Sequence, residues 1–420
     1  MNHLVISPIL LPAVMAGLTI LIARRNLFLV RVLAAGTVMG LFALALYGLG
    51  QSQPIPYFLG SWPAPFGIVL VMDRLASLML LLVASLSIVV LLYAYSSGWD
   101  QRGRHFYALF QFQLMGLNGA FLTADAFNLF VFFEVLLIAS YGLMVHGGGA
   151  ARTRAGVQYV AFNLVGSTLF LFALAVIYNV TGTLNMADIS EKLPLLPQGD
   201  AGLVRAAAVM LMMVFAVKGA LVPLQFWLPG TYSVTSGPVA ALFAVMTKVG
   251  AYAIIRFGTL VFPPSLTVTG ALWGDLLWVA AIVTIMVGAL GVLAAQRLQL
   301  TVSFAAIGSM GVVFLAVSDF TPASTAAALY YIIHSTLATA LLFLLADLVL
   351  TQRKTDDLAQ PAPVFAGVGT IGAAFMLGAI AMVGLPPLSG FVAKLMVLDS
   401  LRDNAVWGWT AVLLGSLVTM

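Results

Sequence analysis

The sequence predicts an all-α protein that crosses a membrane many times, and three observations lead to this prediction. Of its 420 residues, 62% are hydrophobic and 8% are charged, whereas about 25% of residues are charged in an average soluble protein. Its mean hydropathy is +1.09. Its apolar residues form long unbroken runs, as expected for helices that span a bilayer with about 20 residues each and unlike the alternating strands of a membrane barrel.

Thirteen apolar segments are predicted to be membrane spans. They are residues 4–22, 28–50, 72–95, 106–122, 126–145, 157–180, 204–228, 237–262, 271–294, 301–318, 323–350, 365–398 and 405–420. The first segment lacks the basic start and the cleavage site of a signal peptide, so we interpret it as a span. The last is short, and we interpret it either as a half-length element or as a span that continues beyond this sequence.

Basic residues predict the orientation of the spans. They occur in alternate connecting segments, at Arg24/Arg25, Arg102/Arg104, Arg152/Arg154, Arg297 and Arg353/Lys354. Of the segments between them, 51–71 is uncharged and 181–203 is mainly acidic. Because short loops rich in lysine and arginine stay in the cytoplasm, we expect the N-terminus outside. These basic cytoplasmic loops also explain the net charge of +4, so the charge does not indicate a nucleic-acid partner.

Proline interrupts two of the predicted spans. Pro223 lies in the seventh span, and the twelfth contains GLPPLSGF at 384–391. Proline removes a backbone donor, and such a break is tolerated in a membrane only against protein or a water-filled cavity. Broken helices at corresponding positions of two repeats point to a transporter's site. We therefore predict three N-terminal helices in 1–105, followed by inverted five-helix repeats in 106–262 and 271–420.

Four charged residues and one histidine within the apolar spans are the candidates for chemistry. They are Glu134, Lys218, Lys248, His334 and Lys394. A charged side chain at the bilayer centre costs at least about 2.5 kcal/mol, so such residues are rare and commonly functional. We therefore treat these five as the candidate site for moving ions or protons.

Glu134 and Lys218 are predicted to form a proton switch. Burial favours the neutral forms of both groups, whereas proximity favours the charged forms, so a pair that can separate exchanges a proton. The structural alternatives are a neutral Glu134 bonded to a hydroxyl, or a Lys218 that serves only as its counter-ion. Lys248 has no acidic residue in its own span, which favours a relay role.

His334 and Lys394 are predicted to continue the path. The hydroxyls of Ser335, Thr336 and Thr339 predict a hydrated patch around His334, whose imidazole titrates near neutral pH. The alternative is a core histidine with satisfied hydrogen bonds. Lys394 follows the break in the twelfth span, and its alternative role is to extend toward Asp399.

Other motifs do not predict chemistry. The chain has no cysteine, which excludes thiolate metal sites and iron–sulfur clusters. Residues 367–372 fit G-x-G-x-x-G, but no strand precedes them, and helix packing explains them better. His146 precedes three glycines, yet no G-x-S-x-G motif accompanies it. His3 and His105 show no metal-ligand spacing. We expect no cofactor, no bound metal and no nucleic-acid partner.

Four motifs together resemble one known family. They are FNLFVFFEVLLIASYGL with Glu134, FAVKGALVPLQFWLPG with Lys218, SGPVAALFAVMTKVGAY with Lys248 and GLPPLSGFVAKL with Lys394. They resemble the antiporter-like, proton-translocating subunits of respiratory complex I, Mrp-type cation/proton antiporters and membrane-bound hydrogenases. Within this family they are similar to the D subunits of Mrp antiporters. The resemblance covers almost the whole chain and implies about fourteen spans with an inverted five-helix repeat.

The resemblance also implies a role for each residue. Glu134 and Lys218 correspond to an ion pair in the first half-channel, Lys248 to a central relay, His334 to the link with the second half, and Lys394 to the terminal proton donor or acceptor. It implies an ion-transporter subunit, not an enzyme, which couples protons to a monovalent cation within a hetero-oligomer of the bacterial inner membrane. The alternative is a proton-pumping subunit of NADH:quinone oxidoreductase or of a membrane-bound hydrogenase, with the same path.

Overall fold

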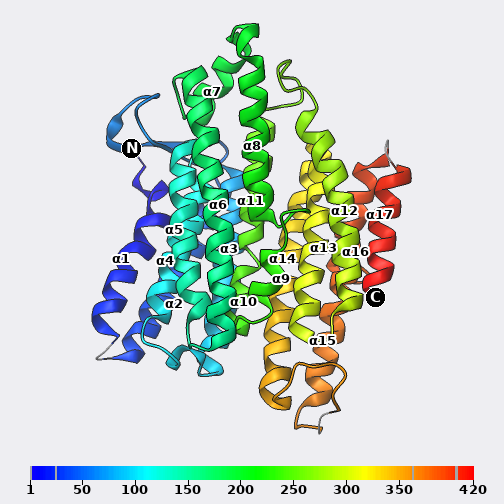
Figure 1. The fold of residues 1–420 in the computed structure, drawn as a ribbon. Helices are drawn as coiled ribbons and strands as arrows, with labels where there is room; N and C mark the ends of the chain where they lie inside the picture. Colours follow the sequence, from blue (N-terminus) through cyan, green and yellow to red (C-terminus); the bar gives the residue numbers. More distant parts are fainter. Residues whose placement is uncertain (1, 24–25, 362–363, 403–404) are drawn as a thin grey trace. The chain divides into compact units, whose positions relative to one another are not determined.

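A computed structural model describes residues 2–23, 26–361, 364–402 and 405–420. The chain is built almost entirely of helices (Figure 1), which confirms the predicted class. Within these ranges, nine helical segments are long and apolar enough to cross a membrane, and three shorter apolar helices accompany them. Arg24 and Arg25, two of the predicted orientation signals, lie outside the described residues.

The helices follow the predicted spans closely. Their bounds are α1 Ser7–Ile22, α2 Leu27–Leu49, α3 Arg74–Ser96, α4 Phe106–Leu122, α5 Ala126–Val145, α6 Ala150–Thr181, α7 Met186–Lys192, α8 Ala201–Gly219, α9 Trp227–Tyr232, α10 Gly237–Phe243, α11 Met246–Leu260, α12 Leu272–Ala294, α13 Leu298–Val317, α14 Pro322–Arg353, α15 Val368–Val383, α16 Ser389–Ser400 and α17 Ala405–Thr419. Short 3-10 helices are η1 His3–Val5, η2 Leu59–Ser61, η3 Trp99–Gln101, η4 Leu193–Leu195 and η5 Gln198–Asp200.

A small hairpin interrupts the helical architecture between α2 and α3. Strand β1 (Ile55–Phe58) pairs antiparallel with β2 (Val69–Met72), and Ile55 lies opposite Met72. Val69, Leu70 and Met72 are buried, so the apolar start of the third predicted span, at residue 72, is in fact the end of a strand. The helix begins only after Asp73, whose side chain accepts a hydrogen bond from the Ala76 amide and caps it.

The described chain folds into two compact units. The first comprises Met1–Val214, Leu260–Phe262 and Leu266–Thr269, and the second comprises Phe215–Thr259, Pro263–Ser265 and Gly270–Met420. In the first, α4 packs against α1 and α5, and α5 against α6. In the second, α12 packs against α13, while α14 contacts α10, α13, α15 and α16. The predicted repeats, 106–262 and 271–420, are defined by symmetry, not by packing, and remain a prediction.

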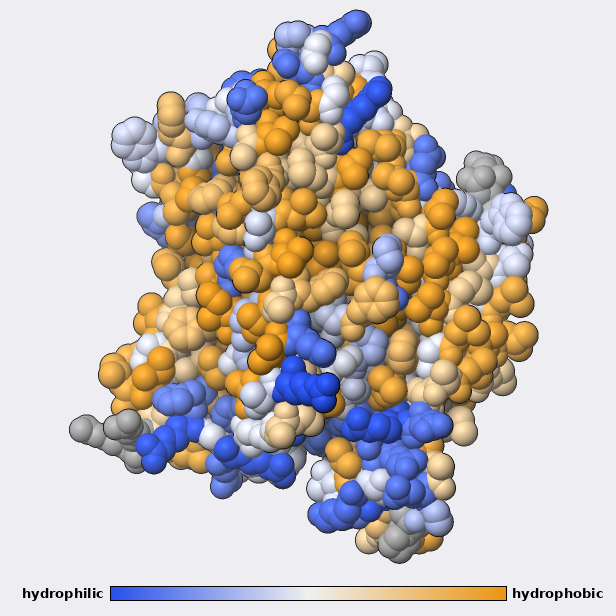
Figure 2. All heavy atoms as spheres, in the orientation of Figure 1, coloured by the Kyte–Doolittle hydropathy of each residue, from blue (hydrophilic) through white to orange (hydrophobic). Residues whose placement is uncertain are grey.

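Apolar side chains cover much of the molecular surface. On the face drawn in Figure 2, hydrophobic residues cover the middle of the helices, and hydrophilic residues gather mainly toward their ends. On α6, for example, Leu164, Val165 and Phe172 are all more than half exposed. Such a surface is suited to lipid or to other apolar helices, in agreement with the multi-pass membrane architecture.

Three helices are interrupted, of which two were predicted. One interruption separates α8 from α9 around Pro223, and another separates α15 from α16. The third lies between α10 and α11, inside the predicted span 237–262, which is present as a candidate span at Gly237–Leu260 but was not expected to be interrupted. There the amides of Ala244, Val245 and Lys248 bond to carbonyls three residues earlier, which is the tighter 3-10 pattern. The interruption ends directly before Met246, two residues before Lys248.

Candidate functional site

Lys218 lies at the end of a helix in the protein interior. It is the second-last residue of α8 and is 7% exposed. The last turn of a helix favours a positive charge because unpaired carbonyls point toward it. Beyond the break, the Val222 amide donates to Thr284 Oγ1 at 3.0 Å, and Trp227 Nε1 donates to the Val217 carbonyl at 2.9 Å. These bonds satisfy backbone groups that the interrupted helix leaves without partners.

Lys248 is the most deeply buried of the candidate residues. It lies in the first turn of α11 and is 1% exposed. Its Nζ is 3.5 Å from Thr247 Oγ1, a distance at the limit of a hydrogen bond. A buried ammonium with one weak hydroxyl partner is poorly stabilised. The arrangement suits a group that gains and loses a proton more than one that holds a permanent charge.

The structure brings the segments that carry Lys218 and Lys248 together. A Cβ atom at Gly250 would lie 2.5 Å from the Gly219 amide nitrogen and 2.6 Å from the Phe215 carbonyl oxygen. The backbones of α8 and α11 are therefore in contact at this point, as small residues allow in membrane helices. The crossing lies one residue after Lys218 and two residues after Lys248.

His334 contacts the break in the twelfth predicted span. It is 6% exposed on α14, and its Nδ1 is 2.9 Å from Ser389 Oγ, the first residue of α16. Its Nε2 is buried without a well-formed hydrogen bond among the described residues; the nearby Ala381 carbonyl interacts with the ring. The charges of Lys248 and Lys394 both act on the imidazole, which places His334 within electrostatic reach of the two lysines.

The surroundings of His334 differ in part from the prediction. Thr336 and Ser335 donate to the Ile332 carbonyl of their own helix and do not line the cavity beside His334, so the hydrated patch around them stays a prediction. Thr339 Oγ1 is buried and has no partner within the described ranges. A cavity of about 390 Å³ instead adjoins the imidazole, and Leu337 and Ser389 are among its lining residues. The polar neighbour of His334 is thus Ser389.

Lys394 contacts the same interruption, between α15 and α16. Its Nζ donates to the Val383 carbonyl at 2.7 Å and to Ser416 Oγ at 2.6 Å. Val383 is the last residue of α15, so its carbonyl has no partner within that helix. The alternative role for Lys394, a contact with Asp399, is wrong, because Asp399 pairs with Arg402 while the Lys394 side chain extends to α15 and α17.

Glu134 is a half-buried residue of α5 in the first compact unit. Ser167 Oγ of α6 donates to its Oε1, so a hydroxyl partner exists, as the structural alternative for this residue expects. Lys218 belongs to the second unit. The pairing of Glu134 with Lys218 therefore remains a prediction.

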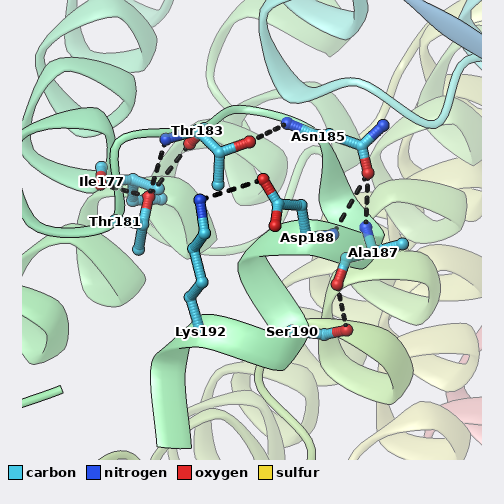
Figure 3. A network of polar contacts seen from close by, with 8 residues as sticks. All are labelled: Ile177, Thr181, Thr183, Asn185, Ala187, Asp188, Ser190 and Lys192. Atoms are coloured by element: carbon cyan, nitrogen blue, oxygen red, sulfur yellow. Dashed lines mark hydrogen bonds and ion pairs between the residues drawn. The ribbon is translucent and has the colours of Figure 1, made fainter. Parts of the chain in front are cut away.

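Lys192 shows how a lysine outside the apolar spans is held. On α7 its Nζ donates to Asp188 Oδ2 at 3.1 Å, and its side chain is 39% exposed (Figure 3). Asn185 caps the same helix by accepting from the amides of Ala187 and Asp188. Such exposed pairs contribute only about 0.3–0.5 kcal/mol. The hydrogen bonds of Lys248 and Lys394, by contrast, go to hydroxyl and carbonyl oxygens in the interior.

Three serines contact the candidate residues without having been identified from the sequence. They are Ser167 beside Glu134, Ser389 beside His334 and Ser416 beside Lys394. Serine is common in membrane helices, where it bonds to its own backbone, so its presence alone carries no signal. Only the packing of α6, α16 and α17 shows which serines contact a titratable group.

Comparisons with known proteins show the family of this chain. Residues 123–419 match the family described as NADH:quinone oxidoreductase/Mrp antiporter, TM. The chain is 40% identical over 430 residues to the D subunit of a probable K(+)/H(+) antiporter of Rhizobium meliloti, covering 96% of this chain and 80% of that protein. It is also 40% identical over 407 residues to the D subunit of the Na(+)/H(+) antiporter of Bacillus subtilis, covering 95% and 80%.

Solved structures show the same relationship. A chain of the Mrp complex from Dietzia sp. DQ12-45-1b has a TM-score of 0.92 at 27% identity, covering 100% of this chain and 78% of that chain. A chain of respiratory complex I from Thermus thermophilus has a TM-score of 0.84 at 27% identity, covering 99% and 86%. The fold and these relatives identify an antiporter-like membrane subunit. The chain belongs to the NADH:quinone oxidoreductase/Mrp antiporter family.

Proposed function

We propose that this chain is the proton-translocating subunit of a multisubunit monovalent cation/proton antiporter. The observation that supports this most is the placement of Lys218, Lys248, His334 and Lys394, which all lie beside interrupted helices or contact them. Interrupted helices occur in membranes where polar groups or water are enclosed. The relatives named as D subunits of Na(+)/H(+) and K(+)/H(+) antiporters give the reaction class.

Protons in this proposal move between neighbouring titratable groups. Glu134 and Lys218 exchange a proton as their ion pair forms and separates. Lys248 carries the proton across the middle of the chain, His334 passes it on, and Lys394 releases or takes it up at the far end. A monovalent cation, Na⁺ or K⁺, moves in the opposite direction within the complex. The chain itself supplies no cofactor to this path.

The setting proposed is the inner membrane of a bacterium, with the N-terminus outside. The basic segments at Arg102/Arg104 and Arg152/Arg154 support a cytoplasmic position for the ends of α3 and α5. The Mrp complex and complex I are multisubunit assemblies, and likeness to their chains supports partner subunits for this one. The apolar surface of α6 and other helices is expected to contact lipid or these partners.

The alternative is a pump that electron transfer in partner subunits drives, as the likeness to complex I suggests. One experiment separates the two. The complex is purified with its partners, reconstituted in vesicles and given a Na⁺ or K⁺ gradient without any electron donor. We expect proton flux that depends on the cation. Flux that appears only when an electron donor and acceptor are added would support the redox pump and contradict the antiporter.

A further inference from the structure

A small cavity lies beside Lys394 on the side toward α13 and α14. Its volume is about 30 Å³, and Ser309, Tyr331, Lys394, Ser416 and Thr419 are its polar lining residues. A buried water needs about 10–15 Å³ of such space and two to four polar partners. The cavity is therefore large enough for about two water molecules, and its walls supply partners for them.

The serine and threonine hydroxyls in this wall present acceptors to the cavity. Ser309 donates to the Ala306 carbonyl, Ser416 to the Val412 carbonyl and Thr419 to the Gly415 carbonyl. Because each hydroxyl has one proton and two lone pairs, its lone pairs remain for outside donors. Ser416 uses this capacity to accept from Lys394 Nζ at 2.6 Å. Ser416 thus holds the ammonium at the cavity wall.

Tyr331 connects this cavity with His334. Its ring packs edge-to-face against the imidazole, with ring centroids 5.9 Å apart, and it also lines the cavity of Lys394. The larger cavity beside His334 is lined by the preceding residue of α14, Tyr330, and by Ala381 of α15. The residue after Ala381, Met382, lines the small cavity. Consecutive residues on each of two helices thus line the two cavities.

We propose that the proton step between His334 and Lys394 passes through this small cavity, with Tyr331 as the relay hydroxyl and Ser416 as a positioning residue. The inference rests on the proposed function, since it names the route for one step of that proton path. Neither residue belongs to the four motifs that carry the family resemblance.

The step is a balanced chain of proton transfers. An N–H bond of the His334 imidazolium breaks as its proton passes through a water to the Tyr331 oxygen, while the phenolic O–H proton moves to a cavity water. That water gives one of its protons to the neutral Lys394 amine. Every bond that breaks is matched by one that forms, no electron is transferred, and one positive charge moves from imidazolium to ammonium. Ser416 keeps the amine within reach of the water.

Tyr331→Phe tests the relay in the reconstituted complex. The ring and its packing remain and only the hydroxyl is lost, so the complex is expected to assemble. Cation-dependent proton flux should fall by roughly 100-fold, the lower range for losing a proton-transfer group, and its solvent deuterium isotope effect should increase. Tyr178→Phe is the control, because this tyrosine of α6 is 54% exposed and lines neither cavity; it should transport at the wild-type rate.

Ser416→Ala tests the positioning role. The Ser416 hydroxyl accepts from the Lys394 ammonium and so stabilises its protonated form. Loss of a hydrogen bond to a charged group changes such a protonation equilibrium by about tenfold or more. In Ser416→Ala the part of the pH profile of transport that reports Lys394 should therefore move about one unit toward lower pH. Ser416→Thr keeps the hydroxyl and should restore the wild-type profile. Thr410→Ala, on an exposed position of the same helix, should leave the profile unchanged.

Further variants separate this inference from the proposed function. Lys394→Ala should abolish flux, and wild-type flux in that variant would contradict the proposed path itself. If Lys394→Ala is inactive while Tyr331→Phe and Ser416→Ala keep the wild-type rate and pH profile, only the cavity route is overturned. Ala305→Val, which fills space at the cavity wall, tests the route without touching a hydroxyl; unchanged flux in this variant would also overturn it.

Discussion

Each lysine of the apolar spans lies near, or contacts, a place where a helix stops. Lys218 precedes the end of α8, Lys248 follows the tightened turn after α10, and Lys394 donates to the last carbonyl of α15. A helix end leaves backbone carbonyls without partners, and a buried ammonium needs acceptors. In Lys394 one hydrogen bond provides both, because its ammonium donates to the Val383 carbonyl at the end of α15. For Lys394 the interruption thus supplies a carbonyl acceptor, which stabilises the ammonium without fixing its charge as a carboxylate would.

Lys248 is predicted to be indispensable for transport. Lys248→Ala should abolish cation-dependent proton flux in reconstituted vesicles, because no other described side chain supplies a titratable group at this position, while the complex should still assemble. Lys192→Ala is the matched control, since Lys192 lies in an exposed pair with Asp188. Wild-type flux in assembled Lys248→Ala complexes would show that the proton path avoids this residue.

Glu134 and Lys218 are predicted to act together. If they form a buried pair, removing one partner leaves the other charge uncompensated, at a cost of about 3–5 kcal/mol. Losses of transport in Glu134→Ala and Lys218→Ala should therefore not add in the double variant, whereas Glu134→Asp should retain part of the activity. Additive losses would show that the residues work independently. Ser167→Ala, which removes the hydroxyl bonded to Glu134, should impair transport less than Glu134→Ala.

His146, at the end of α5 and outside the membrane spans, is predicted to make stability depend on pH. Burial, together with the nearby His105 and Arg152, lowers the pKa of His146 below its ordinary value of 6.5. The unfolded chain therefore binds more protons than the folded one once the pH falls below 6.5, so stability is lost in that direction. The thermal midpoint of the wild type should decrease between pH 7 and pH 5 by more than that of His146→Gln. Equal decreases would contradict this.

At the scale of helices, the sequence predicted the breaks that proline marks and missed the one that it does not. Pro223 and the GLPPLSGF motif locate two interruptions correctly, because proline cannot continue a helix. The turn between α10 and α11 lies in ALFAVMTK, where no glycine or proline signals it. The hairpin at 55–72 was missed for a similar reason: its second strand, VLVM, continues into an apolar helix and has no alternating pattern of its own.

For the candidate site, the sequence indicates the residues themselves but not the side chains that contact them. Charged residues in apolar runs stand out because their burial is costly, so the sequence alone is enough to identify all five candidates. Their partners depend on which helices pack together. The contact of His334 with Ser389, 55 residues away, and the contact of Lys394 with Ser416 instead of Asp399 are products of tertiary packing that no local pattern records.

The crossing of α8 and α11 gives a prediction at this scale. In Gly250→Ala the new Cβ would lie 2.5–2.6 Å from backbone atoms of Phe215 and Gly219, which is too close for non-bonded atoms. A side chain could relieve such a clash by rotating, but the backbone of a helix cannot. The helices must separate, which would move Lys218 away from α11 and reduce transport in assembled complexes by about 10-fold or more. Gly230→Ala is the control, since nothing lies within 4 Å of its Cβ position. Unimpaired flux in Gly250→Ala would show that this contact does not matter.

At the scale of the whole chain, the candidate residues are divided between the two compact units. Glu134 belongs to the first unit, and Lys218, Lys248, His334 and Lys394 belong to the second. Helix α8 passes from one unit into the other after Val214, only four residues before Lys218.

The orientation of the chain in the membrane gives the last prediction, and the absence of cysteine makes it simple to test. The loop after α3 carries Arg102 and Arg104, and the start of α6 carries Arg152 and Arg154. Because such basic segments stay in the cytoplasm, single cysteines at the exposed positions Gln101 and Ala150 should react with an impermeant maleimide only after the cells are opened. Ser52 and Gln198, also exposed, lie in the uncharged and acidic segments, and cysteines there should react in intact cells. Labelling of Gln101→Cys and Ala150→Cys from outside intact cells would reverse the assignment, and with it the direction in which protons reach Glu134 and Lys394.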